Sequence, residues 1–160
     1  MKYYKYINSR GVESGYGESL LCKDEYDSTD VQNIEVPYEE YQLYKLKQDK
    51  IMLNEELRDS ALYGGVTYQG VLFDSDTDQK VNLAETVRDM SDTDTITWFG
   101  MDNTALLCTK ADLLAIGEEI RNLTKFCWGM NAYLKEQIAE AETLEELEAI
   151  VIDYTMPSEE

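Results

Sequence analysis

The chain has 160 residues, of which 43% are apolar, and this is enough for one domain or two small lobes with a buried core. It contains no histidine, which excludes the usual general base, the usual zinc ligand and the Ser-His and Cys-His nucleophile pairs. Its formal net charge of −19 disfavours direct contact with nucleic acid or an anionic membrane and favours basic partners. We therefore expect a non-enzymatic protein without a cofactor.

Hydropathy and cysteine usage predict a protein that is made and kept in a cytoplasm. No apolar run approaches the length of about 20 residues that a membrane-spanning helix needs, and residues 1–4 lack the apolar core of a secretion signal. The cysteines are widely spaced and form no CxxC pair. We expect Cys22, Cys108 and Cys127 to be reduced and buried.

Residues 1–63 predict an N-terminal lobe of short strands followed by a helix, because aromatic and β-branched residues alternate with turn residues. The expected segments are a strand at 3–7, a turn at 8–11, a glycine-punctuated stretch to 22, an acidic loop at 23–30 and a strand at 31–36. Pro37 suits the first turn of a helix that should reach about Tyr63. This helix carries a leucine stripe of Leu43, Leu46, Leu53 and Leu57, which Lys50 interrupts. The interrupted stripe fits either a short antiparallel pairing or a helix half exposed to solvent.

Ten of the twelve tyrosines lie in the first 68 residues. Tyrosine combines a large apolar ring with a polar tip and is enriched where protein surfaces meet. We therefore select Tyr38, Tyr41 and Tyr44, on the predicted helix, as candidate partner-binding residues. The alternative is a sheet whose rim happens to use tyrosine.

Residues 64–160 predict a second lobe, which begins at the paired glycines Gly64 and Gly65. Its expected segments are a strand at 66–73, a hairpin with strands at 95–99 and 105–108 around a turn at 100–103, and a helix at 110–139. The Thr109 hydroxyl should accept a first-turn amide of this helix, near the Asp112 carboxylate. The expected buried stripe is Leu113, Ile116, Ile120, Leu123, Cys127, Met130 and Leu134.

Two further local signals belong to this lobe. Thr143 and Glu146 form a capping box for a last short helix through Ile150 and Ile152. Trp98 and Trp128 are expected to anchor the core or a lobe interface rather than to form a ligand cage.

An acidic run has the ligand spacing of a calcium loop. Asp74, Asp76 and Asp78 alternate, and Glu85 stands at the twelfth position of that count. The sixth position, which needs glycine for a sharp turn, is Gln79, and a strand rather than a helix precedes the run. We therefore expect an acidic turn that leads into a helix and no metal; these four carboxylates are the metal-site alternative.

The second lobe also resembles a known family. The sequence reads GVTYQGVLFDSD from Gly65, ITWFGMDNTALLCTKADLLAIGEEI from Ile96 and YLKEQIAEAETLEELEAI from Tyr133. With these segments, residues from about 64 to 152 resemble the domain of unknown function found near the C-termini of bacteriophage tail and tail-fibre-associated proteins. The most family-like positions are Trp98, Asp102, Asn103, Leu134 and Lys135. The resemblance implies a setting in phage tail assembly and no catalytic residue.

Together these observations predict an α+β protein with a Tyr-rich lobe at 1–63 and a lobe at 64–160 in which a small antiparallel sheet packs on a long helix. The resemblance implies a tail or tail-fibre accessory protein, either a virion component or a fibre assembly chaperone in the host cytoplasm. Its expected partners are tail proteins or a second copy. The alternative is an acidic mimic of nucleic acid that inhibits a host DNA-binding protein or defence nuclease, since residues 63–160 alone carry a net charge of −14.

Overall fold

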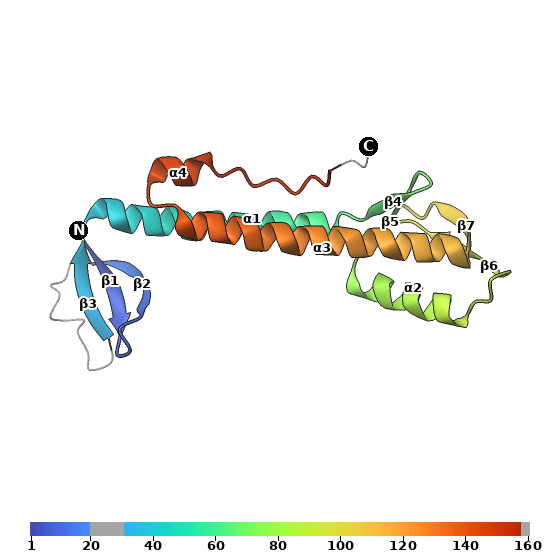
Figure 1. Cartoon of the computed structure of the whole chain (residues 1–160), viewed down its shortest axis with the longest axis horizontal. Helices are drawn as coiled ribbons and strands as arrows, with labels where there is room; N and C mark the ends of the chain where they lie inside the picture. Colours follow the sequence, from blue (N-terminus) through green and yellow to red (C-terminus); the bar gives the residue numbers. More distant parts are fainter. Residues whose placement is uncertain (20–30, 158–160) are drawn as a thin grey trace. The chain divides into compact units, whose positions relative to one another are not determined.

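A computed structural model describes residues 1–19 and 31–157, and it confirms the predicted α+β class (Figure 1). Its strands are β1 (Lys2–Asn8), β2 (Glu13–Ser19), β3 (Val31–Val36), β4 (Val66–Tyr68), β5 (Val71–Phe73), β6 (Thr95–Phe99) and β7 (Ala105–Thr109). Its helices are α1 (Tyr38–Tyr63), α2 (Thr77–Asp89), α3 (Lys110–Glu140) and α4 (Leu144–Ala149). Within these described residues, no helix is both long and apolar enough to cross a membrane.

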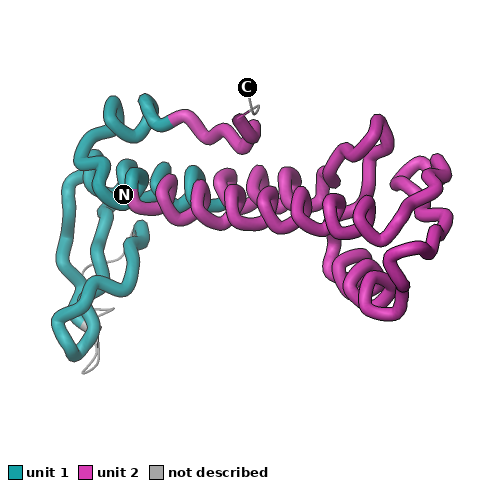
Figure 2. Tube along the Cα trace, turned by 45° about the vertical axis from the view of Figure 1, so that its right-hand side comes forward, with its two compact units in different colours: residues 1–52, 137–150 teal, residues 53–136, 151–160 magenta. Residues whose placement is uncertain are grey.

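Contacts divide the chain into two compact units, coloured separately in Figure 2. Unit 1 contains residues 1–52 and 137–150, and unit 2 contains residues 53–136 and 151–160. Both α1 and α3 therefore contribute to each unit. The predicted domain division at Gly64 and Gly65 follows the end of α1 and stays a prediction.

Unit 1 contains a three-stranded antiparallel sheet in the order β2-β1-β3. Tyr4 of the central strand pairs with Gly17 and with Glu35, and its side chain is buried together with Val36. The predicted strands at 3–7 and 31–36 are thus confirmed. Cys22 and the predicted acidic loop at 23–30 lie outside the described residues.

A small apolar cluster forms the other part of unit 1. Ile138, Ala141 and Leu147 are buried, with Leu43 and Ile51 packed against them. The predicted capping box is present, because the Thr143 hydroxyl accepts from the Glu146 amide and the Glu146 side chain accepts from the Thr143 amide. The helix it starts, α4, ends at Ala149 and is shorter than predicted.

The leucine stripe of α1 is buried only in part, since Leu43 packs against the small apolar cluster. Leu46, Leu53 and Leu57 are exposed, whereas the buried residues of the helix are Asn54 and Leu62. The inward face of α1 in unit 1 is partly cationic instead: the Lys47 ammonium donates to the Ala139 carbonyl at 2.8 Å and the Lys50 ammonium to the Leu147 carbonyl. Both carbonyls lie in the last turns of helices, where a positive charge is favourable.

Unit 2 has the larger core, which joins both hairpins to α2 and α3. Phe73, Cys108, Leu113, Ile116 and Cys127 are fully buried in it. The predicted α3 stripe is confirmed except at Met130, which is half-buried while Asn131 is buried.

The predicted single strand at 66–73 is wrong, because β4 and β5 form an antiparallel hairpin. Its two-residue turn is Gln69–Gly70, with φ of 48° and 80°. Positive φ at both central residues matches the twist of paired strands, so the dipeptide closes a tight hairpin. Gly70 was the sequence signal for this turn.

The two tryptophans differ in environment. Trp98 packs against the core of unit 2, as predicted. Trp128 is 52% exposed, so it does not anchor the core, and its role at a lobe interface stays a prediction. The Arg58 guanidinium lies 4.5 Å from the centroid of the Trp128 ring, and this cation–π contact replaces burial.

Candidate functional site

The tyrosines selected as partner-binding residues pack against the sheet of unit 1. The ring centroid of Tyr3 on β1 lies 5.0 Å from that of Tyr38 and 4.7 Å from that of Tyr41. Tyr16 on β2 stacks on Tyr44 with centroids 4.4 Å apart. Tyr41 and Tyr44 are half-buried, and Tyr38 is 50% exposed. The structure brings the three rings together, but mainly to join α1 to the sheet; their role in partner binding stays a prediction.

Hydrogen bonds close this tyrosine cluster. The Tyr16 hydroxyl donates to Glu40 at 2.9 Å and to Glu13 at 3.3 Å, and the Lys5 ammonium pairs with Glu40 at 3.1 Å. Burial, and then the bond to Glu40, raise the pKa of Tyr16. The phenol therefore stays a neutral donor at physiological pH.

The acidic turn leads into α2, as predicted, and Asp76 is the N-cap of that helix. The Asp76 carboxylate accepts from the Gln79 amide at 2.7 Å. Asp78 lies in the first turn, where a negative charge is favourable, and Glu85 lies in the helix body and is exposed. Among the described residues, no three acidic or thiol side chains gather in a metal-binding cluster.

Exposed apolar side chains on the two hairpins of unit 2 were missed by the sequence analysis. We call this set the hairpin apolar surface: Leu72, Phe99, Met101 and Leu107, exposed by 40%, 56%, 45% and 67%. Phe99 pairs with Ala105, so Leu107, two residues further along β7, is its diagonal neighbour on the same face. The sequence offered one signal for this surface. Side chains alternate between the two faces of a strand, and this alternation in the predicted hairpin places Phe99 and Leu107 on the same face.

Close backbone contacts hold the two hairpins together. The Met101 amide donates to the Leu72 carbonyl at 2.8 Å. A Cβ atom on Gly65 would lie 3.0 Å from the Met101 sulfur and 3.1 Å from Leu72 Cδ1, so these two side chains are neighbours. A Cβ atom on Gly100 would lie 2.7 Å from the Leu72 carbonyl oxygen. The exposed side chains therefore stand on hairpins whose backbones are in contact.

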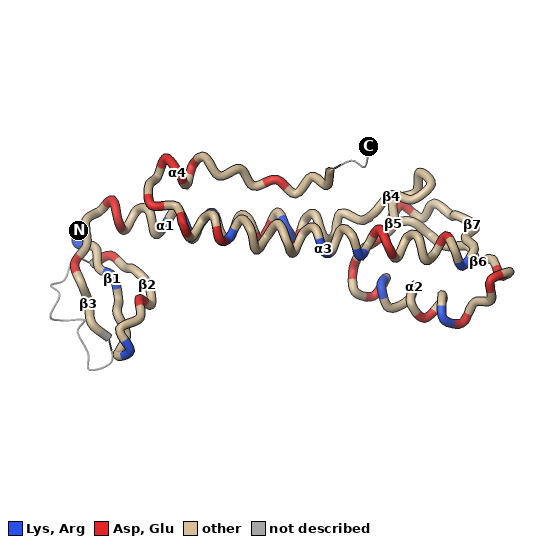
Figure 3. Tube along the Cα trace, viewed as in Figure 1, with Lys and Arg blue, Asp and Glu red and all other residues tan. Residues whose placement is uncertain are grey.

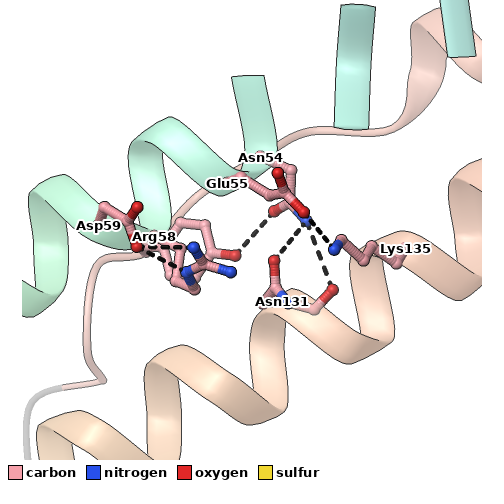
Figure 4. Close-up of polar contacts among 7 residues, drawn as sticks. Asn54, Glu55, Arg58, Asp59, Asn131 and Lys135 are labelled. Atoms are coloured by element: carbon pink, nitrogen blue, oxygen red, sulfur yellow. Dashed lines mark hydrogen bonds and ion pairs between the residues drawn. The ribbon is translucent and has the colours of Figure 1, made fainter. Parts of the chain in front are cut away.

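A second feature that the sequence analysis missed is a polar seam between α1 and α3 in unit 2 (Figure 4). Asn54 is fully buried, and its side-chain NH₂ donates to the Asn131 side-chain oxygen at 3.1 Å. The Tyr154 hydroxyl donates to the Asn54 side-chain oxygen at 2.7 Å. Glu55 and Lys135 form an ion pair beside this network, and Lys135 lowers the pKa of Glu55. The seam therefore joins α1 to α3 through polar contacts.

The comparisons with known proteins give a match to one family model and to no individual protein. No curated protein and no solved structure matches the chain. The model of one family, described as Domain of unknown function (DUF4376), matches residues 45–155. This range includes the hairpin apolar surface, the polar seam and the segments on which the family resemblance rests. Since the match covers more than half of the chain, the protein belongs to this family.

Proposed function

We propose that the protein is a non-enzymatic accessory protein of bacteriophage tails or tail fibres that acts by binding another tail protein. The resemblance of residues 64–152 to domains of tail-associated proteins supports the setting. The absence of histidine supports a binding role over a catalytic one. The protein acts either as a virion component or as a transient assembly chaperone for the fibre.

The observation that carries this proposal is the hairpin apolar surface. Its four large apolar side chains are each at least 40% exposed and lie on hairpins whose backbones are joined. Neighbouring exposed apolar residues are typical of surfaces that bind a protein partner. The tyrosine cluster of unit 1 is the other predicted contact region, with Tyr38 as its most exposed selected residue.

The second candidate function is mimicry of nucleic acid, which the net charge of −19 favours. Figure 3 shows Asp and Glu on both units, and every helix carries them. Exposed carboxylates at Asp89, Asp92 and Asp94 adjoin the start of β6. A basic partner channel would be attracted to such carboxylates at a range of about 8 Å at physiological salt.

Isolation of the affinity-tagged full chain from infected cells, washed at low and at high salt, tests the proposal. We expect a tail or tail-fibre protein in the eluate at both salt concentrations, because apolar contacts resist screening. A host nuclease or DNA-binding protein that is retained at low salt and lost at high salt would overturn the proposal in favour of the mimic.

A further inference from the structure

Unit 2 contains a cavity lined by residues of α2 and α3. Figure 1 shows the course of these two helices. Its volume is about 330 Å³, within the range of sites for small molecules. The residues that line it are Lys80, Leu83, Ala84, Gly117, Ile120, Arg121 and Thr124. None of them belongs to the hairpin apolar surface or to the tyrosine cluster.

The inner wall of this α2–α3 cavity is apolar. Leu83 and Ile120 are buried members of the core of unit 2. Gly117 allows the close approach of the helices there, since a Cβ atom on it would lie 3.0 Å from Leu83 Cδ2. The Thr124 hydroxyl donates to the Ile120 carbonyl at 2.8 Å. An apolar ring or chain therefore fits the wall better than a polar ligand, which would find few partners there.

The charged residues of the lining are both cations. Lys80 and Arg121 line the cavity without any carboxylate, in a chain with 14 basic and 33 acidic residues. Lys80 has no ion pair within the described part of the chain. Arg121 pairs with Glu118, but both side chains are about half exposed, and such surface pairs are weak. An anion at the cavity would therefore find one unpaired and one readily shared cation.

We propose that the α2–α3 cavity binds a small amphipathic anion. The apolar body of the ligand lies against Leu83, Ala84 and Ile120, and its single carboxylate, sulfonate or phosphate group faces Lys80 and Arg121. This site is separate from the proposed partner surface and does not rest on the proposed function.

A pair of fluorescent probes with the same rings tests the charge requirement: 8-anilinonaphthalene-1-sulfonate, which is an anion, and N-phenyl-1-naphthylamine, which is neutral. Each is titrated into the full chain at low and at high salt. We expect saturable binding of one sulfonate probe per chain, tighter than that of the neutral probe and weakened by salt. Equal affinity for both probes would overturn the proposal, because binding would then be purely apolar.

Three variants locate the binding. Lys80→Gln/Arg121→Gln should lower the affinity for the sulfonate probe about tenfold or more and leave the neutral probe unchanged. The matched control Lys45→Gln/Lys125→Gln removes two exposed cations outside the cavity and should change neither. Ala84→Phe should fill the cavity and weaken both probes, with the circular dichroism spectrum unchanged. The site would be contradicted if the control lost as much affinity for the sulfonate probe as Lys80→Gln/Arg121→Gln does. It would also be contradicted if Lys80→Gln/Arg121→Gln bound this probe as tightly as the wild type, because the probe would then bind elsewhere.

Discussion

Single buried polar residues define how α1 and α3 pair in unit 2. Asn54 is fully buried, and its side-chain amide uses donor and acceptor at once, toward Asn131 and Tyr154. A buried polar group costs free energy unless it is hydrogen-bonded, so these bonds favour the observed alignment of the two helices over one that breaks them. The buried asparagines thus specify the register, as a polar residue does in a coiled-coil seam.

Replacing Asn54 should therefore destabilise the protein. Asn54→Ala leaves the Asn131 oxygen and the Tyr154 hydroxyl without this partner and should lower the free energy of unfolding by about 1–3 kcal/mol. Tyr154→Phe should cost less, about 0.5–1.5 kcal/mol, because it removes one bond. Urea unfolding measures both, with Asn82→Ala on the exposed face of α2 as the control. An unchanged midpoint for Asn54→Ala would refute the seam.

Asp76 gives a residue-scale test of the metal alternative. Because its carboxylate caps α2, Asp76→Ala should lower the free energy of unfolding by about 1 kcal/mol in calcium-free buffer. Added calcium should leave the melting temperature of both proteins unchanged. A saturable rise in the melting temperature of the wild type at micromolar calcium, absent in Asp76→Ala, would instead establish the calcium loop.

At the scale of elements, one carboxylate ties the start of α3 to the β4–β5 hairpin. Asp112 accepts from the Thr109 amide at 2.8 Å and from the Thr109 hydroxyl at 2.6 Å. Its other oxygen accepts from the Tyr68 hydroxyl at 2.8 Å and from Gln69 at 3.2 Å. The bonds from Thr109, and then the bond from Tyr68, lower the pKa of Asp112. The Thr109 hydroxyl also accepts from the Asp112 amide at 3.2 Å, which confirms the predicted cap of α3.

This carboxylate should make stability depend on pH. A lowered folded-state pKa means that ionised Asp112 stabilises the fold above the unfolded-state pKa of about 3.9, and that this contribution is lost as the pH falls through the folded-state value. The wild type should therefore unfold at a higher urea midpoint than Asp112→Asn at pH 7 and pH 5. This difference between the two midpoints should shrink at pH 3. Tyr68→Phe should reduce the difference. A difference that stays constant across this range would show that the charge of Asp112 is not what stabilises the cap.

Element type was predictable wherever one local signal dominated. The apolar stripe of α3 and its Thr109 cap agree with each other, and the structure contains both. The buried residues of α1 were not all predictable from leucine spacing, because cations and an asparagine share its inward face and bond to groups distant in sequence. The β4–β5 hairpin was missed because three-residue strands give almost no alternation.

At the scale of the whole molecule, acidic charge and apolar contact surface have different distributions. Carboxylates occur on all helices of both units (Figure 3), whereas the hairpin apolar surface is confined to unit 2. The role of the selected tyrosines in partner binding stays a prediction. Their stacking on Tyr3 and Tyr16 was not predictable from the sequence, because it depends on how the sheet packs against α1. The hairpin apolar surface was not predictable from the sequence, because its position depends on which face of each hairpin the core covers.

Binding to the tail-fibre protein at low and high salt tests the central claim, that partner binding depends on apolar contact rather than on charge. The variants are Phe99→Ser/Leu107→Ser on the hairpin apolar surface, Tyr41→Ala/Tyr44→Ala in the tyrosine cluster and Asp74→Asn/Asp76→Asn/Asp78→Asn in the acidic turn. Val12→Ser/Val151→Ser, which removes two exposed apolar side chains elsewhere, is the matched control. Unfolding curves confirm that each variant is folded.

We predict that binding by the wild type survives high salt and that Phe99→Ser/Leu107→Ser weakens it by at least about tenfold, since a buried apolar anchor contributes more than 1 kcal/mol. The control and the acidic variant should bind like the wild type. Loss of binding only in the acidic variant, together with steep salt sensitivity, would contradict the account and favour a nucleic-acid mimic.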